Sequence, residues 1–249
     1  MNIRNKEVNL LAHFNEARLP ISTIISRSTW RSNVPIVRLS VDERPIEHFM
    51  VDVGDEKNRV EVLNIDKSFR QLVLLVKEPK REYTVPRADR DGNIKQIKEY
   101  TDPTERRYLM GLDERHLFIS GLPKEDINTV AEAHQALKHK AVIEAEKEGK
   151  DVKRQGEYFF IPLTKEEEKE FMVKVKQEKR LRKTLRGRLQ RLGHRAHFIR
   201  RMIVMRRGTK RYAQGHVTHE QHEPMYLPSW HRVYKNRETS SPGINGFVD

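Results

Sequence analysis

KVKQEKRLRKTLRGRLQRLGHRAHFIRRMIVMRRGTKR, residues 174–211, is the stretch on which the interpretation of this chain depends. It contains 16 Lys and Arg side chains and a single acid, Glu178, a balance of +15 in a chain whose total is +13. The rest of the chain is therefore close to neutral. The excess positive charge is thus concentrated in one segment, while the remaining residues have a net charge close to zero. The function of the protein is expected to depend on what this segment contacts.

The residues that lead into this segment predict a long helix. Thr164 and Glu167 have the spacing of a capping box, in which each side chain accepts a hydrogen bond from the other residue's backbone N–H. Acidic side chains fill the next turn and basic ones the far end, an order that the helix dipole favours, and Gly193 supplies a C-terminal stop. The sequence therefore predicts one helix over 165–192, with an apolar stripe that docks on the protein and a row of cations on the exposed face. The stripe consists of Leu181, Leu185, Leu189 and Leu192.

Strands are predicted on the C-terminal side of Gly193. The alternation of side chains in 197–205 favours a strand, with a second helix as the alternative. Residues 211–217 and 224–234 predict two more strands on either side of the loop THEQHEP. Within RQGEYFFIPL, residues 154–163, Gly156 permits a tight turn, and residues 158–161 predict a compact apolar strand that Pro162 ends.

The first half of the chain also reads mainly as strands. A helix is predicted over 7–17, followed by short runs rich in β-branched residues up to residue 86. A polar surface loop or hairpin tip over 86–103, with a turn signal at Asp91-Gly92, comes next, then two strands within 106–123 and a helix from Thr129.

We therefore predict an α+β fold in three parts. A mixed, β-rich domain spans 1–104, and a C-terminal α+β module spans 105–238 and carries the basic helix and the His-rich strands. A flexible tail is predicted over 239–249, which is rich in Ser, Gly and Asn.

Composition excludes several classes of function. The chain has no cysteine, so disulfides, thiolate metal sites and a cysteine nucleophile are excluded, and a reducing cytoplasm is the expected location. It has no uninterrupted apolar run long enough for a signal peptide or a membrane span, so no membrane association is expected. No P-loop, GxGxxG or GxSxG pattern supports nucleotide hydrolysis, dinucleotide chemistry or esterase chemistry.

The charge asymmetry between the two halves indicates a polyanionic partner. The first 150 residues carry 26 basic and 25 acidic side chains, and the last 99 carry 23 and 11. Nucleic acid is the simplest such partner, and the sequence leaves DNA or RNA open. Arg offers a planar fork for phosphate oxygens. The candidate phosphate contacts are Arg180, Lys183, Arg186, Arg188, Arg191, Arg195, Arg200, Arg201, Arg206 and Arg207.

Histidine is the second concentrated residue type, because six of the 11 His side chains fall within 194–231. Imidazole is a common ligand of zinc and other divalent metals, which makes a metal cofactor a hypothesis. On an extended strand His216 and His222 would share a face while His219 points away. Glu220 or Glu223 would then supply a ligand or a general base. The candidate metal ligands are His194, His197, His219 and His222.

Four stretches together resemble a family of uncharacterised bacterial and phage proteins. They are RRYLMGLDERHLFISGLP (106–123), TVAEAHQALK (129–138), RQGEYFFIPL (154–163) and YAQGHVTHEQHEPMYLPSWHRVYKNRE (212–238). That family has an RQG(D/E) strand ending in Pro, a small HxH segment and a terminal strand of the form GxVxHxxHxxLxLxxWHxV. The resemblance covers roughly 105–238 and implies a bacterial or mobile-element setting and a β-rich C-terminal module, without an activity. The matching positions are His194, His197, His219, His222, Trp230 and His231.

Three classes of function follow from these observations. The first is a non-catalytic protein that binds the phosphate backbone of nucleic acid, as a subunit of a larger bacterial or phage nucleoprotein complex with other protein subunits. The second is a metal-dependent hydrolase or nuclease built on the C-terminal histidines. The third is a structural or assembly protein whose basic helix docks on acidic protein surfaces.

Overall fold

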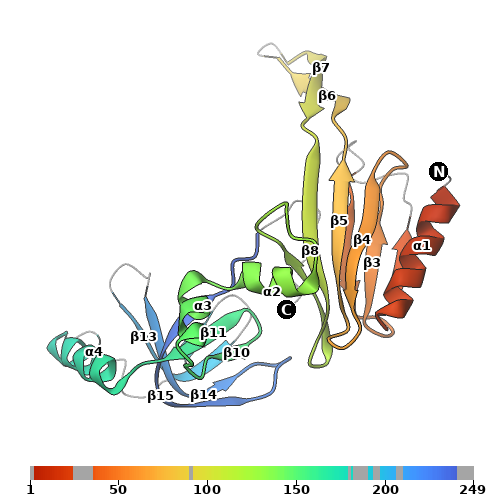
Figure 1. Cartoon of the computed structure of the whole chain (residues 1–249). Coiled ribbons are helices and arrows are strands. Elements are labelled where there is room, and N and C mark those ends of the chain that lie inside the picture. The colour runs from red at the N-terminus through yellow and green to blue at the C-terminus, as the bar shows by residue number, and fades with distance from the viewer. Residues whose placement is uncertain are drawn as a thin grey trace. The chain divides into compact units, whose positions relative to one another are not determined.

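A computed structural model describes most of the chain and divides it into two compact units (Figure 1). Unit 1 comprises Met1–Ala136 with Glu238–Asp249, and unit 2 comprises Leu137–Arg237. The described residues are 3–24, 36–89, 92–178, 181, 190–192, 197–205 and 210–239.

Unit 1 begins with a helix packed beside a small sheet (Figure 1). The helix is α1 (Ile3–Glu16), and the sheet has the order β1 (Ile21–Ile24), β3 (His48–Asp52), β2 (Arg38–Asp42). β1 runs parallel to β3, and β2 runs antiparallel to it. The Phe14 ring meets the Phe49 ring edge to face, with centroids 5.7 Å apart, so the helix and the sheet share one buried core.

A four-stranded antiparallel sheet supplies the rest of that core. Its order is β4 (Arg59–Asp66), β5 (Gln71–Glu78), β8 (Thr104–Asp113), β9 (His116–Gly121). The first six residues of β5 are all buried, so both faces of this central strand are covered, as its unbroken apolar sequence requires. Between β5 and β8 along the chain, β6 (Arg81–Ala88) and β7 (Ile94–Thr101) form a separate two-stranded ribbon, which extends the strand predicted up to residue 86 and agrees with a hairpin, the alternative to a surface loop over 86–103. The helix α2 (Val130–Leu137) follows β9.

The predicted domain boundary between residues 104 and 105 falls at the start of β8. This strand pairs with β5 from Thr104 opposite Glu78 to Gly111 opposite Gln71, so it completes the sheet of unit 1. The units divide after Ala136 instead. Apart from Thr239, the predicted tail over 239–249 lies outside the described residues.

The chain leaves unit 2 close to where it enters it. The backbone N–H of Arg237 donates to the carbonyl of Leu137 at 2.8 Å. Two residues later, the N–H of Thr239 donates to the carbonyl of Gly121 at 3.0 Å, within unit 1. Unit 2 is therefore an insertion whose first and last residues are hydrogen-bonded to each other.

Unit 2 is built on one six-stranded antiparallel sheet. The strand order is β10-β11-β15-β14-β13-β12. The elements are α3 (Lys140–Lys147), β10 (Lys153–Gln155), β11 (Tyr158–Pro162), α4 (Lys165–Gln177), β12 (Gln190–Leu192), β13 (His197–Val204), β14 (Arg211–Thr218) and β15 (Met225–Lys235). The strands predicted over 197–205, 211–217 and 224–234 are confirmed.

The inner face of this sheet encloses a core of its own. Tyr158 on β11 and Leu192 on β12 belong to the same buried cluster, although they lie near opposite ends of the strand order. The sheet is therefore strongly curved around that cluster. Register shifts between Ile199 and Arg201 and between Ala213 and Gly215 mark β-bulges, which increase the local twist of a strand and allow such curvature.

Two helices cover part of the outer face. α3 places Val142 and Ala145 against Phe159 and Ile161 of β11. α4 packs through Phe171, whose ring centroid lies 4.3 Å from that of Tyr212 and 5.1 Å from that of Trp230. Both helices thus lie over the same side of the sheet, α3 over β11 (Figure 1) and α4 over Trp230 of β15 and Tyr212 of β14.

The predicted helix over 165–192 is wrong in length. Its beginning is confirmed, because Thr164 forms the capping box with Glu167. The helix ends at Gln177, since the next residue, Glu178, has φ −91° and ψ 107°, and Gln190–Leu192 is strand β12. The predicted apolar stripe is also divided, because Leu181 packs with the α4 cluster and Leu192 with the inner core. Leu185, Leu189 and Gly193 lie outside the described residues.

Strands dominate both units, so a β-rich fold with four helices among the described residues describes the chain better than a balanced α+β fold. The helices of the described part are too short and too polar to cross a membrane.

The capping box of α4 gives a first prediction. Replacing Thr164 with Ala leaves the N–H of Glu167 without its side-chain acceptor, so we expect the free energy of unfolding of unit 2 to fall by about 1 kcal/mol. Urea unfolding monitored through Trp230 measures this, in a Trp30→Phe background that leaves one tryptophan. The control Thr164→Ser keeps the hydroxyl and should retain most of the stability. Equal losses in the Ala and Ser variants would contradict the assigned role of the cap.

Candidate functional site

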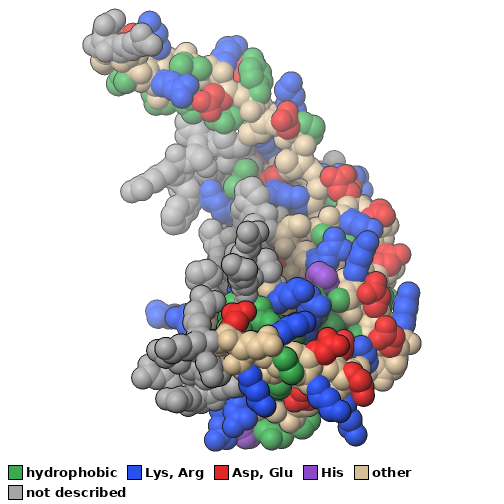
Figure 2. Space-filling model, turned by 90° about the vertical axis from the view of Figure 1, so that its left-hand side faces the viewer, with side chains coloured by type: hydrophobic (Ala, Val, Ile, Leu, Met, Phe, Trp, Pro, Cys, Tyr) green, Lys and Arg blue, Asp and Glu red, His purple; other side chains and the backbone are tan. Residues whose placement is uncertain are grey.

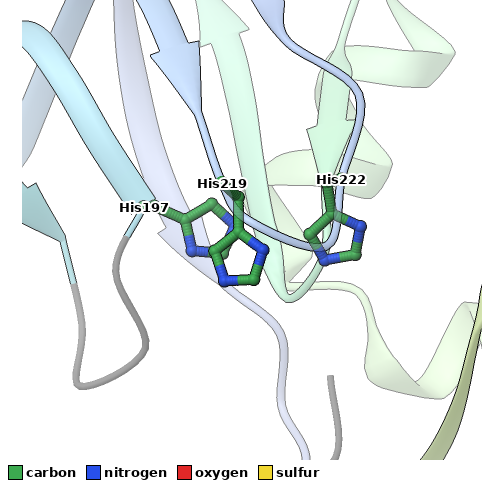
Figure 3. A group of neighbouring side chains, drawn as sticks. All are labelled: His197, His219 and His222. Atoms are coloured by element: carbon green, nitrogen blue, oxygen red, sulfur yellow. The ribbon is translucent and has the colours of Figure 1, made fainter.

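Three histidines from two segments of unit 2 gather at one end of its sheet (Figure 3). His197 is the first residue of β13, and His219 and His222 lie in the loop between β14 and β15. One ring nitrogen from each lies within 4.8 Å of the others. The ring centroids of His197 and His219 are 4.3 Å apart, and those of His219 and His222 are 4.8 Å apart. We call these three residues the histidine cluster.

The cluster is largely enclosed by protein. His197 and His222 are buried, with 0% and 6% of their surface exposed, whereas His219 is partly exposed. The ring of Tyr158 meets that of His197 edge to face, with centroids 5.0 Å apart. The backbone N–H of Gln221 donates to Nδ1 of His219 at 3.1 Å and so shapes the turn that carries the loop. The cluster thus has two buried members and one that faces solvent.

The β10–β11 turn closes against the cluster through a glycine. Gly156 has φ +54°, in the left-handed region. A Cβ atom at this position would lie 2.7 Å from Nε2 of His222 and 3.3 Å from Nε2 of His197, so only a residue without a side chain fits. Gln155 Nε2 also donates to the carbonyl of Glu223 at 2.6 Å, which ties the turn to the histidine loop. These contacts explain why glutamine and glycine occur at positions 155 and 156 of the RQG sequence.

The arrangement that a continuous extended strand would give the C-terminal histidines, with His216 and His222 on one face and His219 pointing away, does not occur. β14 ends at Thr218, so the chain turns and brings His219 and His222 together. His216 instead pairs with Tyr226, their ring centroids 4.9 Å apart. His194 lies outside the described residues, so its place in the predicted ligand set stays a prediction.

His231 is buried and is not one of the histidine cluster, and its Nδ1 donates a hydrogen bond to the carbonyl of Ser229, 2.8 Å away. Because a carbonyl only accepts, Nδ1 carries the proton. Burial lowers the pKa of His231, the Ser229 carbonyl opposes this, and the charge of Lys153 lowers it further. The ring is therefore held as a neutral donor in the sheet.

Three of the ten predicted phosphate-binding cations are described, and all three are exposed: Arg191 on β12, with Arg200 and Arg201 on β13. Arg200 and Arg201 form no ion pair with a carboxylate of the described residues. Over the described surface seen in Figure 2, Lys and Arg side chains are interspersed with Asp and Glu. The other seven predicted cations lie outside the described residues: Arg180, Lys183, Arg186, Arg188, Arg195, Arg206 and Arg207.

The part of the outer sheet face beyond α3 and α4 carries aromatic rings as well as arginines. Residues that pair across strands share a face, so Arg191 lies beside Phe198, and His216 lies beside Tyr226. Phe198 is 37% exposed and Tyr226 is 54% exposed. Arg200 lies two residues from Phe198, and its stem passes the Cβ position of Gly215 at 3.3 Å. We call Arg191, Phe198, Arg200, His216 and Tyr226 the aromatic–arginine face.

Sequence reasoning missed the aromatic part of this face. Few aromatic residues lie within 174–211, and Tyr226 lies outside that segment. The pairing of β14 with β15 brings Tyr226 beside His216 and onto the face of Phe198. The polar–apolar alternation around Phe198 was the available signal, because Phe198 falls on the side opposite His197 and Ile199.

Comparisons of this chain with protein-family models, with curated proteins and with solved structures gave no match. The resemblance to the bacterial and phage family therefore stays a prediction.

The close approach at Gly156 gives a second prediction. Gly156→Ala places a methyl group 2.7 Å from Nε2 of His222 and also strains a left-handed residue, whereas Gly149→Ala, at φ +72° with no atom within 4 Å, adds strain alone. The strain in each costs about 1–2 kcal/mol. We expect the Gly156 variant to lose at least about 1 kcal/mol more in urea unfolding than the Gly149 variant. Equal losses would show that the turn does not press on the histidines.

The lowered pKa of His231 gives a third prediction. Below a pH of about 6.5 the unfolded chain takes up a proton that the folded ring resists, so the free energy of unfolding falls until the folded pKa is reached. His231→Asn keeps an N–H donor for Ser229 but does not titrate. We expect a smaller loss of stability in this variant than in the native chain between about pH 7.5 and 5.5. Equal losses over that range would refute the assignment.

Proposed function

We propose that this protein is a non-catalytic nucleic-acid-binding protein and that unit 2 contacts the nucleic acid. The observation that carries the proposal is the aromatic–arginine face, which combines exposed rings with exposed cations on one side of a sheet. In this proposal the protein is one subunit of a larger nucleoprotein complex. The chemistry of the face also indicates which form of nucleic acid it takes.

Exposed rings on a sheet suit single-stranded nucleic acid. Bases that are not paired can stack on aromatic side chains, and such stacking contributes about 1–3 kcal/mol per base without requiring a particular sequence. Phe198 lies on β13 and Tyr226 on β15, two strand spacings or roughly 10 Å apart. His216, on the strand between them, extends the second platform through its contact with Tyr226. Two successive platforms on one face support a single strand that crosses the sheet.

Arginines beside the rings supply phosphate contacts. Arg191 pairs across strands with Phe198, and Arg200 lies next along β13 on the same side. Each guanidinium offers a fork of donors to phosphate oxygens, and neutralised phosphates release counterions. The face lies within or beside the segment 174–211, in which 16 cations accompany one acid. Local cation excess of this kind favours a polyanion over a protein surface of mixed charge.

Two acids near the face set a limit on its extent. Glu220 and Glu223 are exposed in the loop that joins β14 to β15. Because carboxylates repel phosphate, we place the phosphate contacts over β12 and β13, beside Arg191 and Arg200, and let only a stacked base reach Tyr226 on β15.

A metal-dependent hydrolase or nuclease is the second candidate, favoured by the histidine cluster. Hydrolysis would also need a general base beside the ion, for which the loop offers Glu220 and Glu223. The aromatic–arginine face requires no such chemistry, so binding without cleavage is the simpler proposal. The third candidate, docking on acidic proteins, uses the same arginines but gives no role to the exposed rings.

Binding to labelled single-stranded DNA and RNA of mixed sequence tests the proposal. We expect measurable affinity at about 50 mM salt that falls as salt rises. Replacing Arg191 and Arg200 with Gln should reduce the slope of log K against log salt by about 1.4, which is 0.7 for each lost contact to a single strand. The matched control is Arg44→Gln with Arg115→Gln, two exposed arginines of unit 1. A stronger variant changes Arg186, Arg188, Arg191 and Arg195 to Glu.

The aromatic arm of the same experiment separates stacking from charge. Phe198→Ala and Tyr226→Ala should each weaken binding by about 1–3 kcal/mol and leave the salt slope unchanged. Tyr100→Ala is the control, because Tyr100 is 57% exposed, close to the 54% of Tyr226, but lies on the ribbon of unit 1.

The outcomes of these binding experiments distinguish the candidate functions. Absent binding, or binding that is indifferent to both the Arg and the aromatic variants, would refute the proposal. Cleavage of the strand on addition of a divalent metal, lost in His219→Ala, would move the assignment to the hydrolase. Loss of binding in the Arg variants alone would support phosphate contacts and refute the stacking platforms.

A further inference from the structure

We propose that the histidine cluster binds one transition-metal ion of the zinc class through His197, His219 and His222. This site lies on residues other than the aromatic–arginine face and does not depend on the proposed nucleic-acid function. Imidazole nitrogen suits zinc, copper, nickel and iron, and the chain contains no cysteine to draw softer metals. Many zinc sites have three protein ligands and leave the fourth coordination position open. Three histidines can form a site of this kind.

The spacing of the ring nitrogens fits a metal after a small contraction. At a Zn–N distance of about 2.0–2.1 Å, tetrahedral ligands lie roughly 3.3 Å from one another. The three nitrogens of the cluster lie within 4.8 Å of one another. The widest pair therefore closes by roughly 1.5 Å on binding, a movement that rotation of a histidine side chain supplies.

Gly156 keeps a side chain away from the two buried ligand atoms. A Cβ atom at this position would lie 2.7 Å from Nε2 of His222 and 3.3 Å from Nε2 of His197, so both nitrogens border the same stretch of backbone. A methyl group there would crowd both nitrogens and hinder the ring movement that metal binding requires. The left-handed glycine thus allows the tight turn without placing a side chain against the two rings.

His219 completes the set from the solvent side. It is the partly exposed member, so an ion would enter past it and reach the two buried rings. Its Nδ1 accepts the N–H of Gln221, which leaves Nε2 with the proton when the ring is neutral. Coordination through either nitrogen therefore replaces this hydrogen bond, by displacing it at Nδ1 or by moving the ring proton there. We expect the turn at Gln221 to change most on binding.

The buried location distinguishes this cluster from chance surface histidines. His197 and His222 are 0% and 6% exposed, which limits competition from water for the ion. The ion would join the start of β13 to the β14–β15 loop, next to the β10–β11 turn that Gln155 already ties to Glu223. Bound metal would consequently hold together three segments of unit 2 that are distant in sequence.

Metal binding by the purified full-length chain tests the inference. The protein is stripped with a chelator, dialysed and titrated with Zn²⁺, with metal content measured by mass spectrometry and Co²⁺ used as a coloured substitute. We expect one equivalent of metal per chain, visible absorption of tetrahedral Co²⁺, and a rise in the melting temperature of unit 2. Each of His197→Ala, His219→Ala and His222→Ala should weaken binding at least about tenfold.

A control variant and a second measurement distinguish loss of the metal site from loss of folding. His216→Ala removes an exposed histidine of the same unit and should bind metal like the native chain. If a variant of a buried histidine fails to fold, His219→Ala, at the partly exposed position, and NMR of the histidine rings in the native chain decide the matter. Signals of His197, His219 and His222 should shift with metal, while that of His216 should not.

Several results would refute the proposed metal site. No saturable binding, binding that survives all three substitutions, or ring shifts confined to other histidines would each refute the site. Gly156→Ala should also weaken metal binding, and Gly149→Ala should not. None of these outcomes bears on binding through Arg191, Arg200, Phe198 or Tyr226, so failure here and failure of the nucleic-acid proposal are distinguishable.

Discussion

The architecture of unit 2 depends on the absence of a side chain at Gly156. At this left-handed residue the β10–β11 turn comes so close to His197 and His222 that no Cβ would fit. Gln155 fixes the approach by donating to the carbonyl of Glu223. Strand β10, at one end of the strand order, is thereby held against the loop that follows β14. This contact sets the distance between the β10–β11 turn and the histidines, while the β-bulges of β13, β14 and β15 allow the sheet to curve around its inner core.

One sheet presents two different chemistries because neighbouring side chains along a strand point to opposite faces. On β13, His197 and Ile199 turn inward while Phe198 turns outward. The inner side gives a small buried group of nitrogen ligands, and the outer side gives rings and guanidinium groups in contact with solvent. A change of register by one residue on β13 would exchange the two sides. The register of β13 with β12 and β14 therefore has to place the core residues inward and Phe198 outward at the same time.

Local signals in the sequence predicted local structure well. The capping box at Thr164 and the strands on either side of the loop THEQHEP were readable because each depends on neighbours in the chain. The helix over 165–192 was overestimated because leucine spacing and charge order are compatible with a helix and do not require one. Pairing of Gln190–Leu192 with β13 outweighed that propensity, since a strand there completes the sheet and buries Leu192.

The candidate sites were only partly predictable for the same reason. The residue types of the histidine cluster were identified and the end of the strand before THEQHEP was predicted, but the path by which this loop brings His219 and His222 beside His197 depends on contacts between distant segments. Tyr226 could not be associated with Phe198 without the pairing of three strands. Contacts between residues far apart in sequence depend on which strands pair with one another. The periodicity of apolar residues predicts individual strands but not their pairing.

The hydrogen bond between Arg237 and Leu137 has a consequence for how this protein is organised as a gene product. The first and last residues of unit 2 are adjacent, a geometry that suits an inserted domain, because both of its ends connect to the rest of the chain at one place. All the strand pairings of β1 to β9 are made within unit 1, so none of them uses a strand of unit 2. The cationic segment and both candidate sites therefore lie together in one inserted unit.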